Sequence, residues 1–272
     1  MSLDQSFDEE EDKMSFLDHL EILRWHLIRI VIALFVFATL AFFFKGFVFD
    51  TLVLAPIYND FATYQLFCKL SHFLQLGDKL CFDTITFNVI NITMAGQFTM
   101  HIIVSIVAGI IAAFPYILYE VWRFIKPALK KGEQNYARGL VFWGSFLFLS
   151  GVSFGYYLIT PLSVQFLGGY TVSDIVSNQI SLRSYISTVT TITLSCGLVF
   201  QLPIIVYFLS RLGFVTPKLM KTYRRHAIIA VLLLSAIITP PDISSQVLVS
   251  LPLLLLYEIS IWISRMVEKR SS

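Results

Sequence analysis

Four long apolar stretches constrain this chain more than any other feature of its sequence. They cover residues 27–44, 98–121, 139–160 and 185–209. A helix that crosses the hydrocarbon core of a bilayer needs roughly 20 mostly apolar residues at about 1.5 Å of rise each. With 56% hydrophobic and 14% charged residues over 272 positions, the chain is also too apolar for an ordinary soluble domain. The sequence therefore predicts an all-α integral membrane protein.

A further apolar stretch is interrupted by the sequence TPPD at residues 239–242. Proline lacks an amide hydrogen and disfavours helical geometry in the residue before it, so the two prolines predict the end of a helix. Asp242 or Ser244 can cap the next helix. The two arms, predicted at 225–239 and 243–262, are short for a bilayer crossing. A pair of short crossing helices and a re-entrant hairpin both fit this pattern.

The positions of lysine and arginine predict the topology. Basic residues are retained on the cytoplasmic side during insertion, and 16 of the chain's 20 fall in segments that share one side. These are Lys13, Arg24, Arg29, Arg123, Lys126, Lys130, Lys131, Arg138, Arg211, Lys218, Lys221, Arg224, Arg225, Arg265, Lys269 and Arg270. Both termini are therefore expected in the cytoplasm, with six crossings, or four crossings and a re-entrant pair.

The domain organisation follows from the same patterns. One membrane domain is expected over residues 15–265, followed by a cytoplasmic tail at 266–272. Residues 1–14 are acidic and polar, which fits a solvated cytoplasmic tail rather than a cleavable signal or an arginine-rich transit peptide.

The predicted external segment, residues 45–97, contains Cys68 and Cys81, whereas Cys196 falls inside the fourth span. In an oxidising compartment a Cys68–Cys81 disulfide would close a loop of about a dozen residues and contribute roughly 3 kcal/mol. Two free thiols are the alternative.

Polar residues inside apolar spans are costly and mark candidate functional positions. Gln201 fits either an interhelical hydrogen bond or a substrate contact. Glu258 is expected to pair with Arg265, and His101 is expected to be structural.

Catalytic patterns point away from an enzyme. GVSFG at 151–155 matches the G-x-S-x-G nucleophile pattern, but it lies in a helical span, where small residues serve close helix packing. No phosphate-binding loop, HExxH or paired-cysteine zinc pattern is found in the sequence. We therefore predict no catalytic residues, no metal site and no cofactor.

Four segments, taken in order, resemble the TatC family of the twin-arginine protein translocase. They are HLEILRWHL at 19–27, LAPI at 54–57, YILYEVWRFIKPALKKGE at 116–133 and ITPPDISSQVLVSLPLLLLYEI at 238–259. The resemblance covers residues 15–270. It implies six transmembrane helices in a concave arrangement, with a short fifth and sixth helix and both termini cytoplasmic.

The resemblance also implies a function. Proteins of this family bind twin-arginine signal peptides at the cytoplasmic face and move folded proteins across the membrane with the proton-motive force. TatA and TatB type subunits, membrane lipids and further copies of the chain are the implied partners, and nucleic acid is not. The implied location is the bacterial cytoplasmic membrane, with an organellar membrane as the alternative. A secondary transporter for a small solute is the alternative function.

The residues carried over from the family fall into two groups. The signal-peptide site falls on Glu133 and Phe124, with Glu21 and Arg24 from the first segment. Pro56 and Asp242 are the implied functional residues of the external side.

The chain also departs from the family at three places. Ile22 stands where the family's first-segment glutamate usually lies, Gln201 stands where many relatives have glutamate, and Gln134 begins a pair that replaces a basic pair. The first departure leaves Glu21 as the available carboxylate, about 100° away around the helix.

Overall fold

The computed structural model describes residues 16–58, 60–73, 75, 77, 81, 88–125, 137–173, 178–239 and 243–271. Within these ranges the fold is almost entirely helical, as the apolar stretches predict. The main helices are α1 (Phe16–Phe43), α3 (Gly96–Ile125), α4 (Ala137–Phe154), α5 (Thr160–Gly169), α6 (Leu182–Val199), α7 (Leu202–Arg211), α9 (Arg224–Ile238) and α10 (Ile243–Ser271).

Shorter elements complete the fold. They are η1 (Phe47–Val53), η2 (Ala55–Ile57), α2 (Ala62–Phe73), β1 (Asn88–Ile90), η5 (Gly155–Ile159), β2 (Gln179–Ser181) and α8 (Pro217–Thr222). The segment η5 is a turn of π-helix that joins α4 to α5, so these three form one continuous, bent helix.

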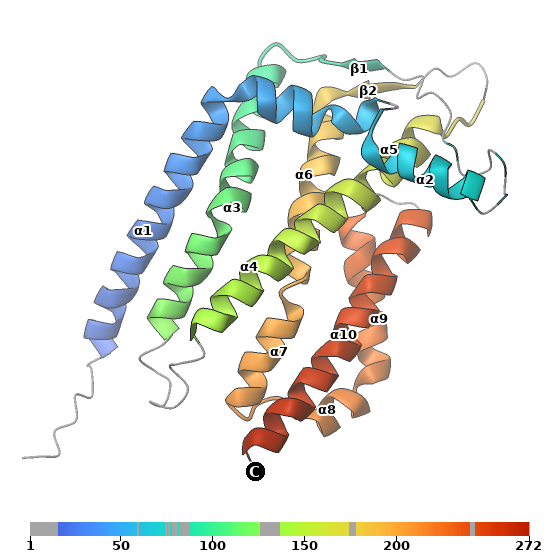
Figure 1. The fold of residues 1–272 in the computed structure, drawn as a ribbon. Coiled ribbons are helices and arrows are strands. Elements are labelled where there is room, and N and C mark those ends of the chain that lie inside the picture. The colour runs from blue at the N-terminus through green and yellow to red at the C-terminus, as the bar shows by residue number, and fades with distance from the viewer. Residues whose placement is uncertain are drawn as a thin grey trace, which may run out of the picture.

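The helices run between two ends of the molecule (Figure 1). At one end, the upper one in the figure, α2, β1 and β2 cover the helices; we call this the capped end. At the other, α1 begins, α3 and α7 end, and α10 reaches the C-terminus. We call it the basic end because it carries Arg24, Arg123, Arg211, Lys218, Lys221, Arg224, Arg225, Arg265 and Lys269.

Among the residues that the structure describes, five helical stretches are long and apolar enough to cross a membrane. They are Leu20–Phe43, Gly96–Ile125, Gly139–Gly169, Leu182–Arg211 and Ser245–Lys269. Helix α9 has 15 residues and is shorter than these. The expectation of a short sixth helix was wrong, because α10 continues well past residue 262 and has 29 residues. The two prolines and Asp242 lie outside the described residues.

The prolines within the second and fourth stretches act differently. Helix α3 continues through Pro115. The fourth stretch breaks at Gln201, and α7 starts immediately afterwards with Pro203 in its first turn. A proline in the first helical turn is tolerated because its missing amide hydrogen has no intrahelical partner there.

Several helix contacts depend on glycine, and at two of the described glycines a Cβ atom would lie within 3.0 Å of the backbone of a neighbouring helix. A Cβ atom at Gly109 of α3 would lie 2.8 Å from the backbone nitrogen of Ala38 in α1. A Cβ atom at Gly151 of α4 would lie 2.7 Å from the carbonyl oxygen of Cys196 in α6. The helix-packing interpretation of the GVSFG segment is therefore correct, and Ser153 in its centre is exposed on a helix rather than set on a strand–turn–helix elbow.

The capped end is stabilised by hydrogen bonds from α2. The hydroxyl of Tyr64 donates to the carbonyl oxygens of Pro56, at 2.9 Å, and Pro161, at 3.2 Å. Thr63 donates to the carbonyl oxygen of Tyr157. Burial raises the pKa of the Tyr64 hydroxyl, so the group stays protonated and keeps its role as donor.

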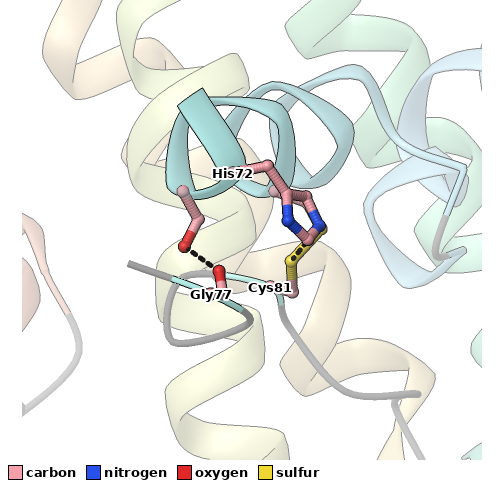
Figure 2. Close-up of a disulfide and its surroundings, with 5 residues drawn as sticks. His72, Gly77 and Cys81 are labelled. Carbon is pink, nitrogen blue, oxygen red and sulfur yellow. Dashed lines mark hydrogen bonds between the residues drawn. A yellow bond between two sulfur atoms is a disulfide. The ribbon is translucent and has the colours of Figure 1, made fainter. Parts of the chain in front are cut away.

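A disulfide joins Cys68 of α2 to Cys81 across a separation of 13 residues. In Figure 2 the His72 ring lies beside the disulfide, with Nε2 3.9 Å from Sγ of Cys81. Ser71, the residue before His72, donates a hydrogen bond to the Gly77 carbonyl oxygen at 2.5 Å. The disulfide and this bond tie the following segment back onto α2.

Strands β1 and β2 connect distant parts of the chain. They pair in parallel, with Asn88 opposite Gln179 and Ile90 opposite Ser181. The strands lead into α3 and α6 respectively, so the pairing holds the starts of these two helices together at the capped end.

We predict that replacing both disulfide cysteines, Cys68→Ser with Cys81→Ser, lowers the free energy of unfolding by about 3 kcal/mol, because the unfolded chain gains loop entropy. Thermal unfolding in detergent measures this effect. A reductant should lower the midpoint of the wild type and leave that of the double variant unchanged. Equal midpoints for wild type and variant without reductant would show that the disulfide does not stabilise the fold.

We also predict that Gly109→Val weakens the contact between α1 and α3, at a cost of roughly 1–3 kcal/mol for overpacking against backbone. Gly139→Val is the matched control, since a Cβ at Gly139 has no neighbour within 4 Å among the described residues. Thermal unfolding of both variants in detergent provides the test, and an equal loss in both would contradict the packing role of Gly109.

Candidate functional site

The basic end brings together several residues of the predicted signal-peptide site. Glu21 and Arg24 are exposed on the first turns of α1. Phe124 is half-buried in the last turn of α3. Glu133 lies outside the described residues, in the segment that connects α3 to α4.

A buried carboxylate lies one turn before Phe124 on α3 and was not singled out from the sequence. Glu120 of α3 is only 2% exposed. Its Oε2 atom lies 2.5 Å from Nδ1 of His26 and 3.8 Å from a guanidinium nitrogen of Arg29, both on α1. Tyr116, one turn earlier on α3, donates a further side-chain hydrogen bond to it. Three polar groups from two helices thus surround one carboxylate.

The arrangement satisfies the requirements of a buried charge. A carboxylate removed from water needs an opposite charge and hydrogen-bond donors, since an unpaired one costs several kcal/mol. Arg29 provides the charge and remains 44% exposed through its side chain. Because an ionised carboxylate can only accept hydrogen bonds, Nδ1–H of His26 is the donor in this pair. We refer to Glu120, His26, Arg29 and Tyr116 as the α1–α3 latch.

The latch contacts the predicted binding residue Phe124. The rings of Phe124 and His26 meet edge to face, with centroids 6.0 Å apart and an interplanar angle of 66°. Glu120 and Phe124 are four residues apart on α3 and share one face of that helix. The position of the Phe124 ring is therefore coupled to the latch through His26.

Gln201 is buried and bridges two helices. Its side-chain amide nitrogen donates to the carbonyl oxygen of Gly144 at 2.9 Å. The bond holds the break between α6 and α7 against α4. This geometry fits the interhelical interpretation of Gln201 rather than a substrate contact.

Glu258 has a different partner from the one expected. It pairs with Arg224 of α9 at 2.5 Å rather than with Arg265. Residue 224 begins α9 while residue 258 lies in the half of α10 nearest the basic end, so the antiparallel packing of the two helices brings them together. Both side chains are about half exposed.

Two residues expected on the external side, His101 and Pro56, lie at the capped end. The Nε2–H group of His101 donates to the carbonyl oxygen of Phe42, 3.1 Å away, and the ring stacks on the Phe42 ring, which gives His101 a structural position. Pro56 is buried in η2, where its carbonyl oxygen accepts the Tyr64 bond.

One group of potential metal ligands occurs among the described residues, formed by Cys68, His72 and Cys81. The two sulfur atoms are joined in the disulfide, so neither is available as a thiolate ligand. With the disulfide formed, the group is therefore part of the capped end and not a metal centre.

Comparison with known proteins extends these observations. A family model described as Sec-independent protein translocase protein (TatC) matches residues 18–252. The TatC protein of Blattabacterium sp. subsp. Periplaneta americana is 37% identical over 262 residues, which cover 96% of this chain and 98% of that protein. The TatC protein of Aquifex aeolicus is 32% identical over 258 residues, covering 94% of this chain and 97% of its own.

The fold is similar to a solved one as well. A crystal structure described as the twin-arginine translocase receptor TatC superposes with a TM-score of 0.71 at 32% identity, covering 92% of this chain and 99% of that one. Sequence and fold agree over nearly the full length. The chain therefore belongs to the TatC family, whose members are non-enzymatic subunits of the Sec-independent protein translocase.

Proposed function

We propose that this chain is the translocase subunit that receives twin-arginine signal peptides, and that it does so at the basic end. The similar crystal structure is described as a twin-arginine translocase receptor. The observation that carries the proposal is the position of Phe124. Its ring lies at the basic end against α1, directly before the segment that contains Glu133.

The chemistry of the basic end suits an arginine pair. A carboxylate binds a guanidinium group through two parallel charged hydrogen bonds, whereas it meets a lysine as a point charge. Glu133 is the proposed main carboxylate, and Glu21, which is exposed on α1, is proposed as a second one. Arg24 keeps the surrounding surface basic, and Phe124 offers a ring face to the cation or to the apolar part of the peptide.

The proposed topology puts the basic end in the cytoplasm, with six crossings. It is supported by the bias of lysine and arginine toward one side of the chain. Helix α9 is then the fifth crossing, with 15 residues and a length of about 22 Å against a hydrocarbon core of about 30 Å. Snorkelling of Arg224 and Arg225 or local thinning of the bilayer makes up the difference.

The subunit is proposed to act as part of a larger assembly in the bacterial cytoplasmic membrane. TatA and TatB type subunits and further copies of this chain complete it, and the proton-motive force drives transport of the folded cargo. Pro56 in η2 and Asp242 in the hairpin are proposed to act on the external side. Thinning of the bilayer around α9 would lower the barrier where cargo crosses.

We predict that Glu133→Ala reduces photo-crosslinking to a radiolabelled twin-arginine precursor in membranes by about tenfold or more, because it removes a charged hydrogen-bonding partner. Wild type should crosslink a twin-lysine precursor far less than the twin-arginine one. Glu258→Gln is the matched control, since it removes a carboxylate of the same end that pairs with Arg224. Equal crosslinking of both precursors by wild type would refute the receptor proposal.

A smaller effect is expected at the first segment. Glu21 is exposed, and exposed ion pairs contribute up to about 1 kcal/mol, so Glu21→Ala should weaken precursor binding by at most about fivefold. Adding Ile22→Glu in that background tests whether the family's usual position can replace it. Full loss of binding in Glu21→Ala would instead make Glu21 the main carboxylate.

A further inference from the structure

The α1–α3 latch contacts Phe124 of the proposed signal-peptide site through the His26 ring, and the site described above makes no direct use of Glu120 or His26. We propose that Glu120 and His26 are positioning residues, which fix the rotation of α1 and the ring of Phe124 for signal-peptide binding. The inference rests on the proposed function, because it assigns the latch a role in that site.

The rotation of helix α1 about its own axis has to be fixed by specific contacts. It packs mainly on α3, and its outward face is exposed, with Phe35 72% accessible. Lipid tails are as apolar as leucine side chains, so burial of apolar surface barely resists rotation of a helix in the bilayer. Close backbone contacts and polar bonds must set the rotation instead.

Three such contacts hold α1 on α3 at different heights. His101 contacts the carbonyl oxygen of Phe42 near the capped end, and Gly109 meets Ala38 in the middle. At the basic end the described residues provide the pair of His26 and Glu120, with Arg29 at the edge. Without this pair, the contacts of α1 with α3 named here would be those at Ala38 and Phe42, and none of them would hold the first turns of α1.

The first turns of α1 are the ones that matter for binding. Glu21 and Arg24 precede His26 by five and two residues, so they lie about 140° and 160° away from it around the helix. Both therefore project from the side of α1 that faces away from the latch. A rotation of α1 would move these two charged groups directly, and would withdraw the His26 ring from Phe124.

An apolar pair would hold the helices together at lower cost. Replacing a buried ion pair with well-packed apolar groups is often neutral or stabilising, and the best-attested use of such a pair is to specify register. The short distance of 2.5 Å and the near-complete burial of Glu120 give the pair one defined geometry. A specifying role accounts for its presence better than a stabilising one.

The test measures the position of α1 and the binding of precursor separately. Nitroxide labels at the exposed positions Leu20 and Phe214 report the distance from α1 to the loop after α7 by pulsed electron spin resonance, in the full-length protein in lipid. Photo-crosslinking of a radiolabelled twin-arginine precursor, titrated in concentration, gives its apparent affinity. The variants are Glu120→Gln, Glu120→Leu and His26→Arg, and Glu258→Gln is the control.

We expect Glu120→Leu to broaden the distance distribution and to weaken apparent affinity about tenfold, while crosslinking at saturating precursor stays near wild type. Glu120→Gln keeps the size of the side chain and an acceptor oxygen. Its distance distribution and its apparent affinity should therefore fall between those of wild type and Glu120→Leu. His26→Arg keeps a hydrogen-bond donor facing the carboxylate and should retain most of the wild-type affinity. Glu258→Gln should match wild type in both measurements.

Several results would overturn the proposal. An unchanged apparent affinity in both Glu120 variants would overturn it, whatever the measured distances. A loss of affinity with an unchanged distance distribution would overturn it as well. If Glu120→Leu does not accumulate in membranes, Glu120→Gln and His26→Arg decide by the same criteria. Failure of the receptor function itself is seen separately, as equal crosslinking of twin-arginine and twin-lysine precursors by wild type.

Discussion

Within a bilayer, helices gain little from burying apolar side chains against one another, because lipid tails provide the same surroundings. This constraint explains which residues hold the present fold together. Glycine allows α1 to approach α3 at Gly109 and α4 to approach α6 at Gly151. Hydrogen bonds between helices supply the rest, through Gln201 on Gly144 and Glu120 on His26. Small and polar side chains thus do for this chain what a hydrophobic core does for a soluble one.

The two ends of the molecule meet this constraint in different ways. At the capped end, a disulfide, the Tyr64 hydroxyl and a short parallel strand pair fasten the connections between helices. At the basic end, the described helix termini are held by side-chain contacts such as the latch and the pair of Arg224 and Glu258. The basic end therefore presents its charges on separate helices, where small movements of a helix change the surface offered to a ligand.

Much of this architecture could be predicted from the sequence. Apolar length predicts the long helices, and ordered segments such as YILYEVWRFIKPALKKGE indicate the family. The cysteine spacing indicated a possible disulfide, which the structure contains. These inferences succeed because apolar length and local spacing are properties of the chain itself.

Other features depend on which helices become neighbours, and the sequence analysis missed them. Glu120 was overlooked, although an ionisable residue in an apolar span is a recognisable signal, because its partners lie 94 and 91 positions away on α1. Glu258 was assigned Arg265 from proximity in sequence, whereas α9 brings Arg224 to it. The length of α10 was underestimated because the residues after 262 are largely polar and charged, a composition also typical of a solvated tail.

The pairing of β1 with β2 has a consequence for the order of assembly. Residues 88–90 reach the capped side before α3 is made, but their partners at 179–181 follow only after α4 and α5. The strand pair can therefore close only once two further membrane-crossing stretches, Gly96–Ile125 and Gly139–Gly169, have been synthesised and inserted. A chain in which either of them is inserted the wrong way round would leave the two strands on opposite sides of the bilayer. Closure of this small sheet thus works as a checkpoint, completed only by correctly inserted molecules.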